Sequence, residues 1–132
     1  MSKTYTGRRT EKGVVVEVSR FNSSGRKLTR PLRHIPFHSP QGLEWGYQGS
    51  GPADLALAIL VDHLREHPPT KGWRAGEKFS RWAGDSQAFK HHEAFKQNFT
   101  ATFADEWSLT TLDINAWLFK RGWSKGWKGD KK

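Results

Sequence analysis

The sequence predicts an α+β fold in which N-terminal antiparallel β-strands pack on a buried central helix, followed by two further helices. Three observations predict it. β-Branched segments fill the first third of the chain, the hydrophobic period changes from two to about 3.6 after residues 49–52, and helical patterns follow residue 85. A length of 132 residues suits one core, so we expect a single domain over residues 1–119 and a basic tail over residues 120–132.

The predicted strands lie in the first 47 residues. Residues 3–8 and 14–18 are rich in β-branched side chains and flank a turn at residues 11–13, which predicts a hairpin. A short strand is expected at residues 27–30. Residues 42–47 alternate large with small or polar side chains, which predicts a further strand.

The central helix is expected to begin at the glycine-rich turn of residues 49–52. Ser50 or Gly51 would cap it, Asp54 would lie near the positive end of its dipole, and Pro68 would prevent its continuation. Its residues are apolar on nearly all sides, so we expect it to be buried.

Two further helices are expected after a surface excursion. Residues 68–84 are rich in proline, glycine and charge, and we interpret them as a basic excursion attached by aromatic side chains. Asp85 would cap a second helix with a phenylalanine core face. Thr110 and Asp113 have the spacing of a capping box for a third helix, which should end by Gly122.

Composition limits the classes of partner and compartment. Lys plus Arg number 22 against 13 Asp plus Glu, giving a net charge of +9 and a pI near 10.1, which favours polyanionic partners. The chain has no cysteine, no apolar run long enough to cross a bilayer, and a polar N-terminus. We therefore expect a cytoplasmic protein of a bacterial or archaeal cell, with no membrane partner.

Residues 39–53, Ser-Pro-Gln-Gly-Leu-Glu-Trp-Gly-Tyr-Gln-Gly-Ser-Gly-Pro-Ala, resemble the signature of a domain family of unknown function. That family consists of small uncharacterised proteins of bacteria, archaea, plasmids and phages. Residues 5–9 and 107–118 are also similar to it, whereas residues 68–96 and the tail differ. The resemblance implies a β-rich and then helical order and a mobile-element setting, and it brings no known activity.

The glycine-rich turn before the central helix is a candidate anion site. Glycines let backbone N–H groups approach a phosphate, and the helix adds its positive end. The spacing matches neither the dinucleotide fingerprint nor the phosphate loop, so a tight reversal of the chain is the simpler interpretation. The candidate ligand-binding residues are Trp45, Tyr47, Gly49, Ser50 and Gly51.

A second candidate is a metal site. His63, Glu66 and His67 match the H-x-x-E-H motif of inverted zinc proteases, in which two histidines one helical turn apart share a metal. His67 directly precedes two prolines and the motif lacks a third ligand, so we expect no cofactor and keep His63 and His67 as secondary metal candidates. The remaining candidate histidines form a site only if the fold brings them together beside Glu93: His34, His38, His91 and His92.

The leading candidate is a set of basic segments interleaved with aromatics. Cations neutralise phosphates and tryptophans stack on unpaired bases, although such residues can also be core anchors and solubilising charges. The predicted nucleic-acid-binding residues are Lys71, Trp73, Arg74, Lys78, Arg81, Trp82, Lys120, Arg121, Trp123, Lys125, Trp127 and Lys128.

These observations favour binding over catalysis, since no serine lies in a nucleophile-elbow context. The leading hypothesis is a non-enzymatic phage or mobile-element protein that engages nucleic acid, a nucleoprotein complex or an acidic protein, with inhibition of host defence as one role. The alternative is a nucleotide- or phosphate-binding protein that uses the turn at residues 46–52. A third is a metal-dependent hydrolase that uses His63, Glu66 and His67.

Overall fold

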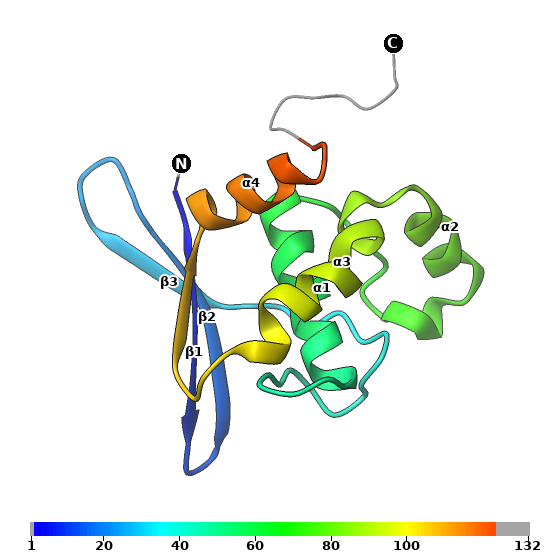
Figure 1. The fold of residues 1–132 in the computed structure, drawn as a ribbon, viewed down its shortest axis with the longest axis horizontal. Helices are drawn as coiled ribbons and strands as arrows, with labels where there is room; N and C mark the ends of the chain where they lie inside the picture. Colours follow the sequence, from blue (N-terminus) through cyan, green and yellow to red (C-terminus); the bar gives the residue numbers. More distant parts are fainter. Residues whose placement is uncertain (1, 124–132) are drawn as a thin grey trace.

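The computed structural model describes residues 2–123 and confirms the α+β class, with a four-stranded antiparallel sheet against a layer of helices (Figure 1). The strands are β1 Thr4–Thr10, β2 Gly13–Phe21, β3 Lys27–Pro31 and β4 Trp107–Thr110. The helices are α1 Ser50–Leu64, α2 Glu77–Asp85, α3 Gln87–Asn98 and α4 Thr111–Lys120, with short 3-10 helices η1 Gly72–Ala75 and η2 Thr100–Thr102.

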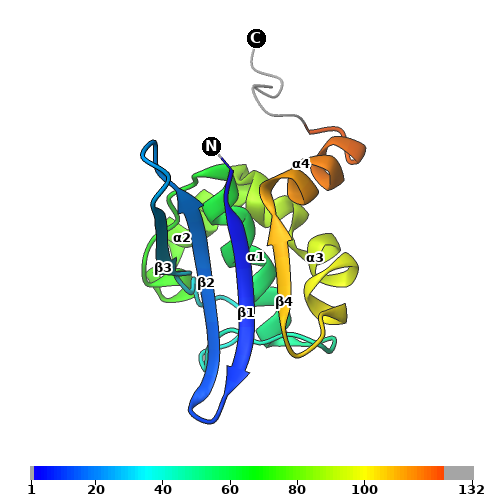
Figure 2. The ribbon, with the colours of Figure 1, turned by 90° about the vertical axis from the view of Figure 1, so that its left-hand side faces the viewer.

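The sheet has the order β3-β2-β1-β4, so β4 pairs with the first strand of the chain. β1 and β2 form the predicted hairpin, with Thr10 opposite Gly13. β4 lies along the other edge of β1, where Gly7 pairs with Trp107. A Cβ on Gly7 would lie 2.3 Å from the indole of Trp107, so the absence of a side chain lets this indole pack against β1. The helices cover one face of the sheet and leave the other uncovered (Figure 2).

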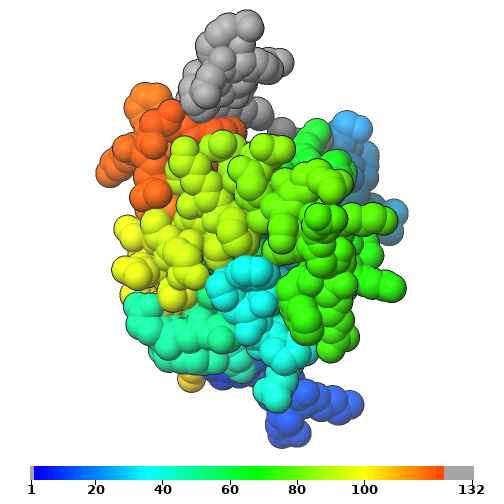
Figure 3. Space-filling model, turned by 90° about the vertical axis from the view of Figure 1, so that its right-hand side faces the viewer, coloured from blue at the N-terminus to red at the C-terminus, as the bar shows by residue number. Residues whose placement is uncertain are grey.

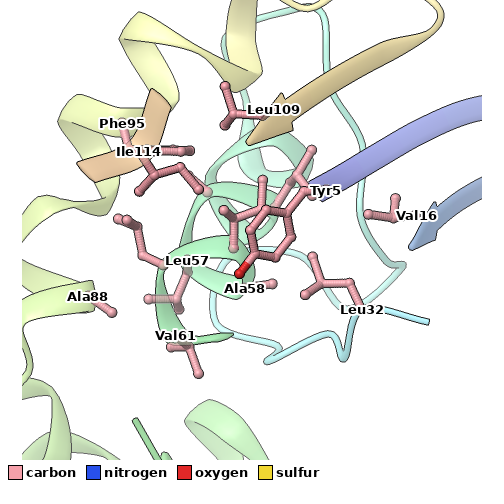
Figure 4. Packing of buried hydrophobic residues seen from close by; sticks show 14 of the residues in the cluster. Tyr5, Val16, Leu32, Leu57, Ala58, Val61, Ala88, Phe95, Leu109 and Ile114 are labelled. Carbon is pink, nitrogen blue, oxygen red and sulfur yellow. The ribbon is translucent and has the colours of Figure 1, made fainter. Parts of the chain in front are cut away.

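Helix α1 is the buried helix that the sequence predicts. Every residue from Gly51 to Val61 is buried, as expected for a helix that is apolar on nearly all sides. Tyr5 from the sheet, Leu57 from α1 and Ile114 from α4 meet in this core (Figure 4). The buried cluster draws on strands and helices from β1 to α4, so the described residues share one hydrophobic core.

The start of α1 differs from the prediction. Its N-cap is Gly49, in an extended conformation and without a side-chain hydrogen bond, whereas Ser50 and Gly51 are already helical. Asp54 is fully buried and accepts hydrogen bonds from the N–H groups of Phe37, His38 and Ser39. The hydrogen bonds of Asp54 therefore hold the loop of residues 37–39 against α1, and they do not involve the N–H groups at the start of the helix.

Residues 42–47 form no strand, so the strand predicted there is wrong. Gly42 and Gly46 have φ values of +120° and +91°, which no pleated strand allows. The N–H of Gly46 donates to the carbonyl of Thr100 at 2.9 Å, and Trp45 is buried. The alternation reflects a loop that inserts one aromatic ring into the core.

Residues 68–84 contain regular structure, η1 and α2, that the sequence analysis did not predict. The N–H of Trp73 donates to the carbonyl of Pro36 at 3.0 Å. Gly72 has a φ of +60°, and a Cβ there would lie 2.0 Å from the same carbonyl oxygen. The ring of Phe79 stacks on Phe37 with centroids 5.2 Å apart. As predicted, aromatic side chains help to hold the segment in place.

Helix α3 begins one residue later than predicted. Its cap is Ser86 and not Asp85, since the Ser86 hydroxyl accepts a hydrogen bond from the N–H of Phe89 at 2.8 Å. Phe95 is buried, as expected for the phenylalanine face. The helix ends at Asn98, and η2 continues the chain toward β4.

The predicted capping box of α4 is confirmed. The Thr110 hydroxyl accepts from the N–H of Asp113, and the Asp113 carboxylate accepts from the N–H of Thr110. The helix ends at Lys120, before Gly122, as expected. Within residues 2–123, none of the helices has the length and apolar composition needed to cross a membrane.

Candidate functional site

A basic cleft lies where α1 ends, beside the inner face of the sheet. It consists of three adjoining depressions of about 280, 430 and 380 Å³, and both Lys3 and Arg65 line all three. The arginines and lysine around these depressions define the basic cleft: Lys3, Arg20, Arg30, Arg33 and Arg65.

Strand register brings three of these cations to one face. Val18 pairs with Tyr5 on one side and with Arg30 on the other, so the three side chains point to the same face of the sheet. That face is the one that α1 covers, because Tyr5 and Val18 are buried. Arg20 follows Val18 by two residues and Lys3 precedes Tyr5 by two, so both lie on this face. These cations therefore lie at the exposed edge of the inner face, next to the buried apolar side chains.

Asp62 lines one of the three depressions and binds two of the cleft cations. Its carboxylate accepts hydrogen bonds from the Tyr5 hydroxyl at 2.7 Å, from Lys3 Nζ at 3.1 Å and from the Arg30 guanidinium. Burial raises the pKa of Asp62, but the hydrogen bonds from Tyr5, Arg30 and Lys3 outweigh burial and lower it overall. Asp62 is therefore ionised at neutral pH and holds two cations in place.

The cleft keeps a surplus of positive charge. Among the described residues that line the cleft, the five cations face the carboxylates of Asp62 and Glu66 and the C-terminus of α1, which carries about half a negative charge. The surplus is roughly two to three charges on the same estimate.

Arg65 occupies a backbone position that normally favours glycine. The N–H of Glu66 donates to the carbonyl of Val61, and that of Arg65 to the carbonyl of Asp62, which is the Schellman pattern at the end of α1. Arg65 has φ 58° and ψ 43°, and among the non-glycine residues described it is the one with positive φ. Such a conformation costs a non-glycine residue about 1 kcal/mol or more. The exposed arginine side chain is therefore present at this point despite a local cost.

Glu66 has a structural role, which argues against the H-x-x-E-H hypothesis. Its carboxylate accepts hydrogen bonds from the Ser86 hydroxyl and from the N–H groups of Gln87 and Ala88, so it supplements the Ser86 cap at the start of α3. Helix α1 ends at Leu64, before Glu66.

The two histidines of the motif are likewise not arranged as metal ligands. His63 Nε2 lies 2.7 Å from the Asn115 side-chain oxygen, and His67 follows the left-handed residue Arg65. The chain reverses between the two histidines, so they do not share one helical face.

One family matches the segment of the chain that carries four of the five cleft cations. The family of unknown function DUF6166 matches residues 5–73, which is more than half of the sequence. The chain belongs to this family. No curated protein and no solved structure shows significant similarity to it. The segment that DUF6166 matches runs from β1 into η1. It contains all of the cleft cations except Lys3, which precedes it: Arg20, Arg30, Arg33 and Arg65.

The fold separates the other histidines into three environments. His34 Nε2 lies 2.7 Å from Asp54, and His91 Nδ1 accepts a hydrogen bond from Arg121. Burial lowers the pKa of His91, and the nearby Arg121 charge lowers it further. His38 and His92 lie together, beside Glu93.

The predicted anion site at the glycine-rich turn is closely packed. Trp45 is buried, and Tyr47 is half exposed. A Cβ on Gly49 would lie 2.5 Å from the Tyr47 ring, and a Cβ on Gly51 would lie 2.6 Å from Glu44 Cβ and 3.1 Å from the Tyr47 hydroxyl. The two glycines thus leave space for the side chains of Tyr47 and Glu44. Ser50 is exposed in the first turn of α1. Ligand binding by this turn stays a prediction.

The predicted basic aromatic segment of residues 71–82 is largely exposed. Trp73 is 48% exposed and Arg74 lies over its ring, while Trp82 is partly buried against Phe79. The remaining predicted members of this segment are exposed: Lys71, Lys78 and Arg81.

The second predicted segment begins at the end of α4. Lys120 is exposed, Arg121 lies over the ring of Trp117 and donates to His91, and Trp123 packs against the core and lines the basic cleft. Helix α3 lies between α2 and α4 on the face shown in Figure 3, so on this face it separates the two described segments. Lys125, Trp127 and Lys128 lie outside the described residues.

The sequence analysis missed the basic cleft because its members are far apart in the chain. Lys3 and Arg65 are separated by 61 intervening residues and become neighbours through strand pairing and the end of α1. One local signal was available: an arginine stands directly after the last helical residue, where glycine is the common choice.

Proposed function

We propose that this protein binds nucleic acid, and that the basic cleft is the principal contact surface. The observation that carries the proposal is the convergence of five cations on adjoining depressions, from β2, β3, the residue before β1, a loop and the end of α1. A surplus of two to three charges spread over several depressions suits a chain of phosphates better than a single anion. The arginine guanidinium suits phosphate because its planar fork forms two parallel hydrogen bonds.

The strained Arg65 is a second support. A residue in the left-handed region persists where the surrounding structure imposes it, and such positions cluster at binding sites. Here glycine would satisfy the same Schellman hydrogen bonds, so the backbone alone does not require arginine. A role for the side chain in binding accounts for its presence. Inhibition of host defence, which a mobile-element setting suggests, stays a prediction.

Fluorescence anisotropy with labelled single-stranded DNA and RNA tests the proposal. The logarithm of the binding constant should fall linearly with the logarithm of salt concentration, and each phosphate of a single strand that a cleft cation neutralises should contribute about −0.7 to the slope. The double variant Arg33→Ala/Arg65→Gly should reduce the magnitude of that slope by about 1.4 and weaken binding at low salt.

The matched control removes two exposed arginines from the predicted aromatic segment. Arg74→Ala/Arg81→Ala changes the net charge by the same amount, so a nonspecific charge effect would weaken both variants equally. We expect the control to retain most of the affinity. Equal loss in both variants, or loss in the control alone, would remove the cleft as the principal surface. Absence of binding at low salt would end the nucleic-acid hypothesis.

A further inference from the structure

Three potential metal-ligand atoms converge between the loop that precedes α1 and helix α3. His38 Nε2 lies 2.9 Å from His92 Nε2 and 3.5 Å from Glu93 Oε2, and His92 Nε2 lies 3.7 Å from the same oxygen. His38 is distant in sequence from the other two, so the fold creates this cluster.

The second ring nitrogen of His92 has a fixed partner. Nδ1 lies 2.6 Å from the carbonyl oxygen of Phe89, which can only accept, so Nδ1 carries a proton. In the neutral imidazole Nε2 then presents a lone pair toward His38 and Glu93. A metal-binding histidine usually donates its other ring N–H to a carbonyl or carboxylate in this way. The ring is also held by burial, since His92 is 2% exposed.

The loop that carries His38 is held by buried groups on both sides. The fully buried carboxylate of Asp54 accepts the N–H of His38 at 2.8 Å and that of Ser39 at 3.0 Å. Phe37 stacks on Phe79 and meets Phe89 edge to face. His38 therefore faces α3 from a loop with little freedom to move.

The three separations match one face of a metal tetrahedron. Ligand atoms at 2.0–2.1 Å from a zinc ion at tetrahedral angles lie about 3.3–3.4 Å apart. The observed separations of 2.9, 3.5 and 3.7 Å lie around that value. The point in their plane that is equidistant from all three atoms lies about 2.0 Å from each, so an ion slightly above that plane is at zinc–nitrogen bonding distance.

We propose that His38 Nε2, His92 Nε2 and Glu93 Oε2 bind a zinc-class transition-metal ion. The other carboxylate oxygen of Glu93 pairs with Lys96 at 3.1 Å, which leaves Oε2 directed at the two imidazoles. The side chains of His38 and Glu93 are 24% and 53% exposed, so solvent can reach the site and supply a fourth ligand. Two histidines, one glutamate and an open position form a ligand set typical of zinc. This inference is independent of the nucleic-acid proposal.

Metal titration of the full-length protein, freed of metal by a chelator, tests the site. We expect Co²⁺ to bind one per chain with the visible absorption of tetrahedral nitrogen and oxygen coordination. Zn²⁺ should displace it, and its affinity is measured against a chromophoric chelator. His38→Asn and Glu93→Gln should each weaken zinc binding on the order of 100-fold, because even the loss of an outer-shell partner costs 10–100-fold.

The control is His67→Asn, which removes an exposed histidine outside the cluster and should leave zinc affinity unchanged. The ligand variants keep the backbone N–H of His38 on Asp54, so circular dichroism and thermal melting should show them folded. Zinc binding that is equally tight in folded His38→Asn would overturn the proposal, as would the absence of stoichiometric binding to the unmodified chain.

Discussion

Arg65 combines a local cost with an exposed charge. Its φ of 58° places it in the left-handed region, where glycine is free of the steric cost and arginine is not. Its side chain lines all three depressions of the basic cleft. Stability and binding therefore make opposite demands on this residue.

Arg65→Gly separates these demands. We expect the free energy of unfolding of this variant to equal that of the unmodified protein or to exceed it by up to about 1 kcal/mol, because the backbone strain is relieved. Its affinity for single-stranded nucleic acid should fall. Urea denaturation and anisotropy on the same preparations measure the two effects. A variant that is less stable and binds equally well would contradict the assignment of Arg65 to the cleft.

Gly72 shows a site at which no side chain is tolerated. A Cβ there would lie 2.0 Å from the Pro36 carbonyl oxygen, a backbone atom that cannot turn away, and the φ of +60° adds strain. We expect Gly72→Ala to lower the free energy of unfolding by roughly 3 kcal/mol or more. Gly25→Ala is the matched control, since its φ is also positive but its Cβ would meet open space. Equal losses in the two variants would assign the effect to backbone strain alone.

At the scale of the elements, Glu66 links the end of α1 to the start of α3. Its carboxylate accepts the Gln87 N–H at 3.0 Å and the Ala88 N–H at 3.1 Å. These are orphan donors of the first helical turn, which otherwise require water or another cap. One side chain thus accepts hydrogen bonds from N–H groups in the first turn of a helix that begins 21 residues away in sequence.

Glu66→Ala tests this link. We expect a loss of about 1–2 kcal/mol in the free energy of unfolding, comparable with the loss of a helix cap. Hydrogen exchange should quicken at the amides of residues 87 and 88 in particular. Glu106→Ala, at an exposed carboxylate, is the control and should leave both measurements unchanged. Unchanged exchange at residues 87 and 88 would show that the Glu66 carboxylate does not protect these two amides.

The elements were predicted correctly where their signals are local. The valine-rich hairpin, the apolar helix and the Thr110–Asp113 box each depend on residues close in sequence. The strand predicted at 42–47 fails because Gly42 and Gly46 take positive φ angles, which the alternation of side-chain size does not reveal. Helix α2 was missed because its segment is rich in glycine and charge, and it is stabilised by Phe79 packing on a distant loop.

The two candidate sites could not be predicted because each is formed by residues that are distant in the sequence. The basic cleft depends on the register of β3 with β2, and the histidine cluster depends on the position of the loop before α1 relative to α3. The sequence analysis identified His38, His92 and Glu93 as residues that only the fold could unite. It did not identify Arg30 or Arg65 as binding residues, because the basic segment of residues 26–33 contains no aromatic side chain and Arg65 stands beside Glu66 in the sequence.

For the molecule as a whole, Asp62 joins the sheet to α1. It accepts hydrogen bonds from Tyr5 in β1 and from Arg30 in β3, and it belongs to α1. Because the folded state lowers the pKa of Asp62, its stabilisation is present above the unfolded value near 3.8 and is lost as pH falls through the folded value. The carboxylate thus contributes to the acid sensitivity of the whole fold.

Asp62→Asn should lower the free energy of unfolding at neutral pH by about 2 kcal/mol, the typical effect of losing hydrogen bonds to a charged group. The difference from the unmodified protein should shrink as pH falls below the folded pKa, because the carboxylate is then neutral in both states. Urea denaturation at a series of pH values measures this, with Glu11→Gln as an exposed control. A difference that is constant with pH would show that the ionised form of Asp62 is not responsible.

The bond between Glu66 and Ser86 also brings the two ends of residues 67–85 to the same point of the molecule. Between these ends the segment also contacts the rest of the molecule, through buried Phe79 and through the hydrogen bond from the Trp73 N–H to the Pro36 carbonyl. The entropic cost of a longer connection grows only slowly with its length. The family match ends at residue 73, within this segment. We therefore expect insertions at exposed residues of this segment to cost little stability as long as the contacts of Gly72, Trp73 and Phe79 are kept.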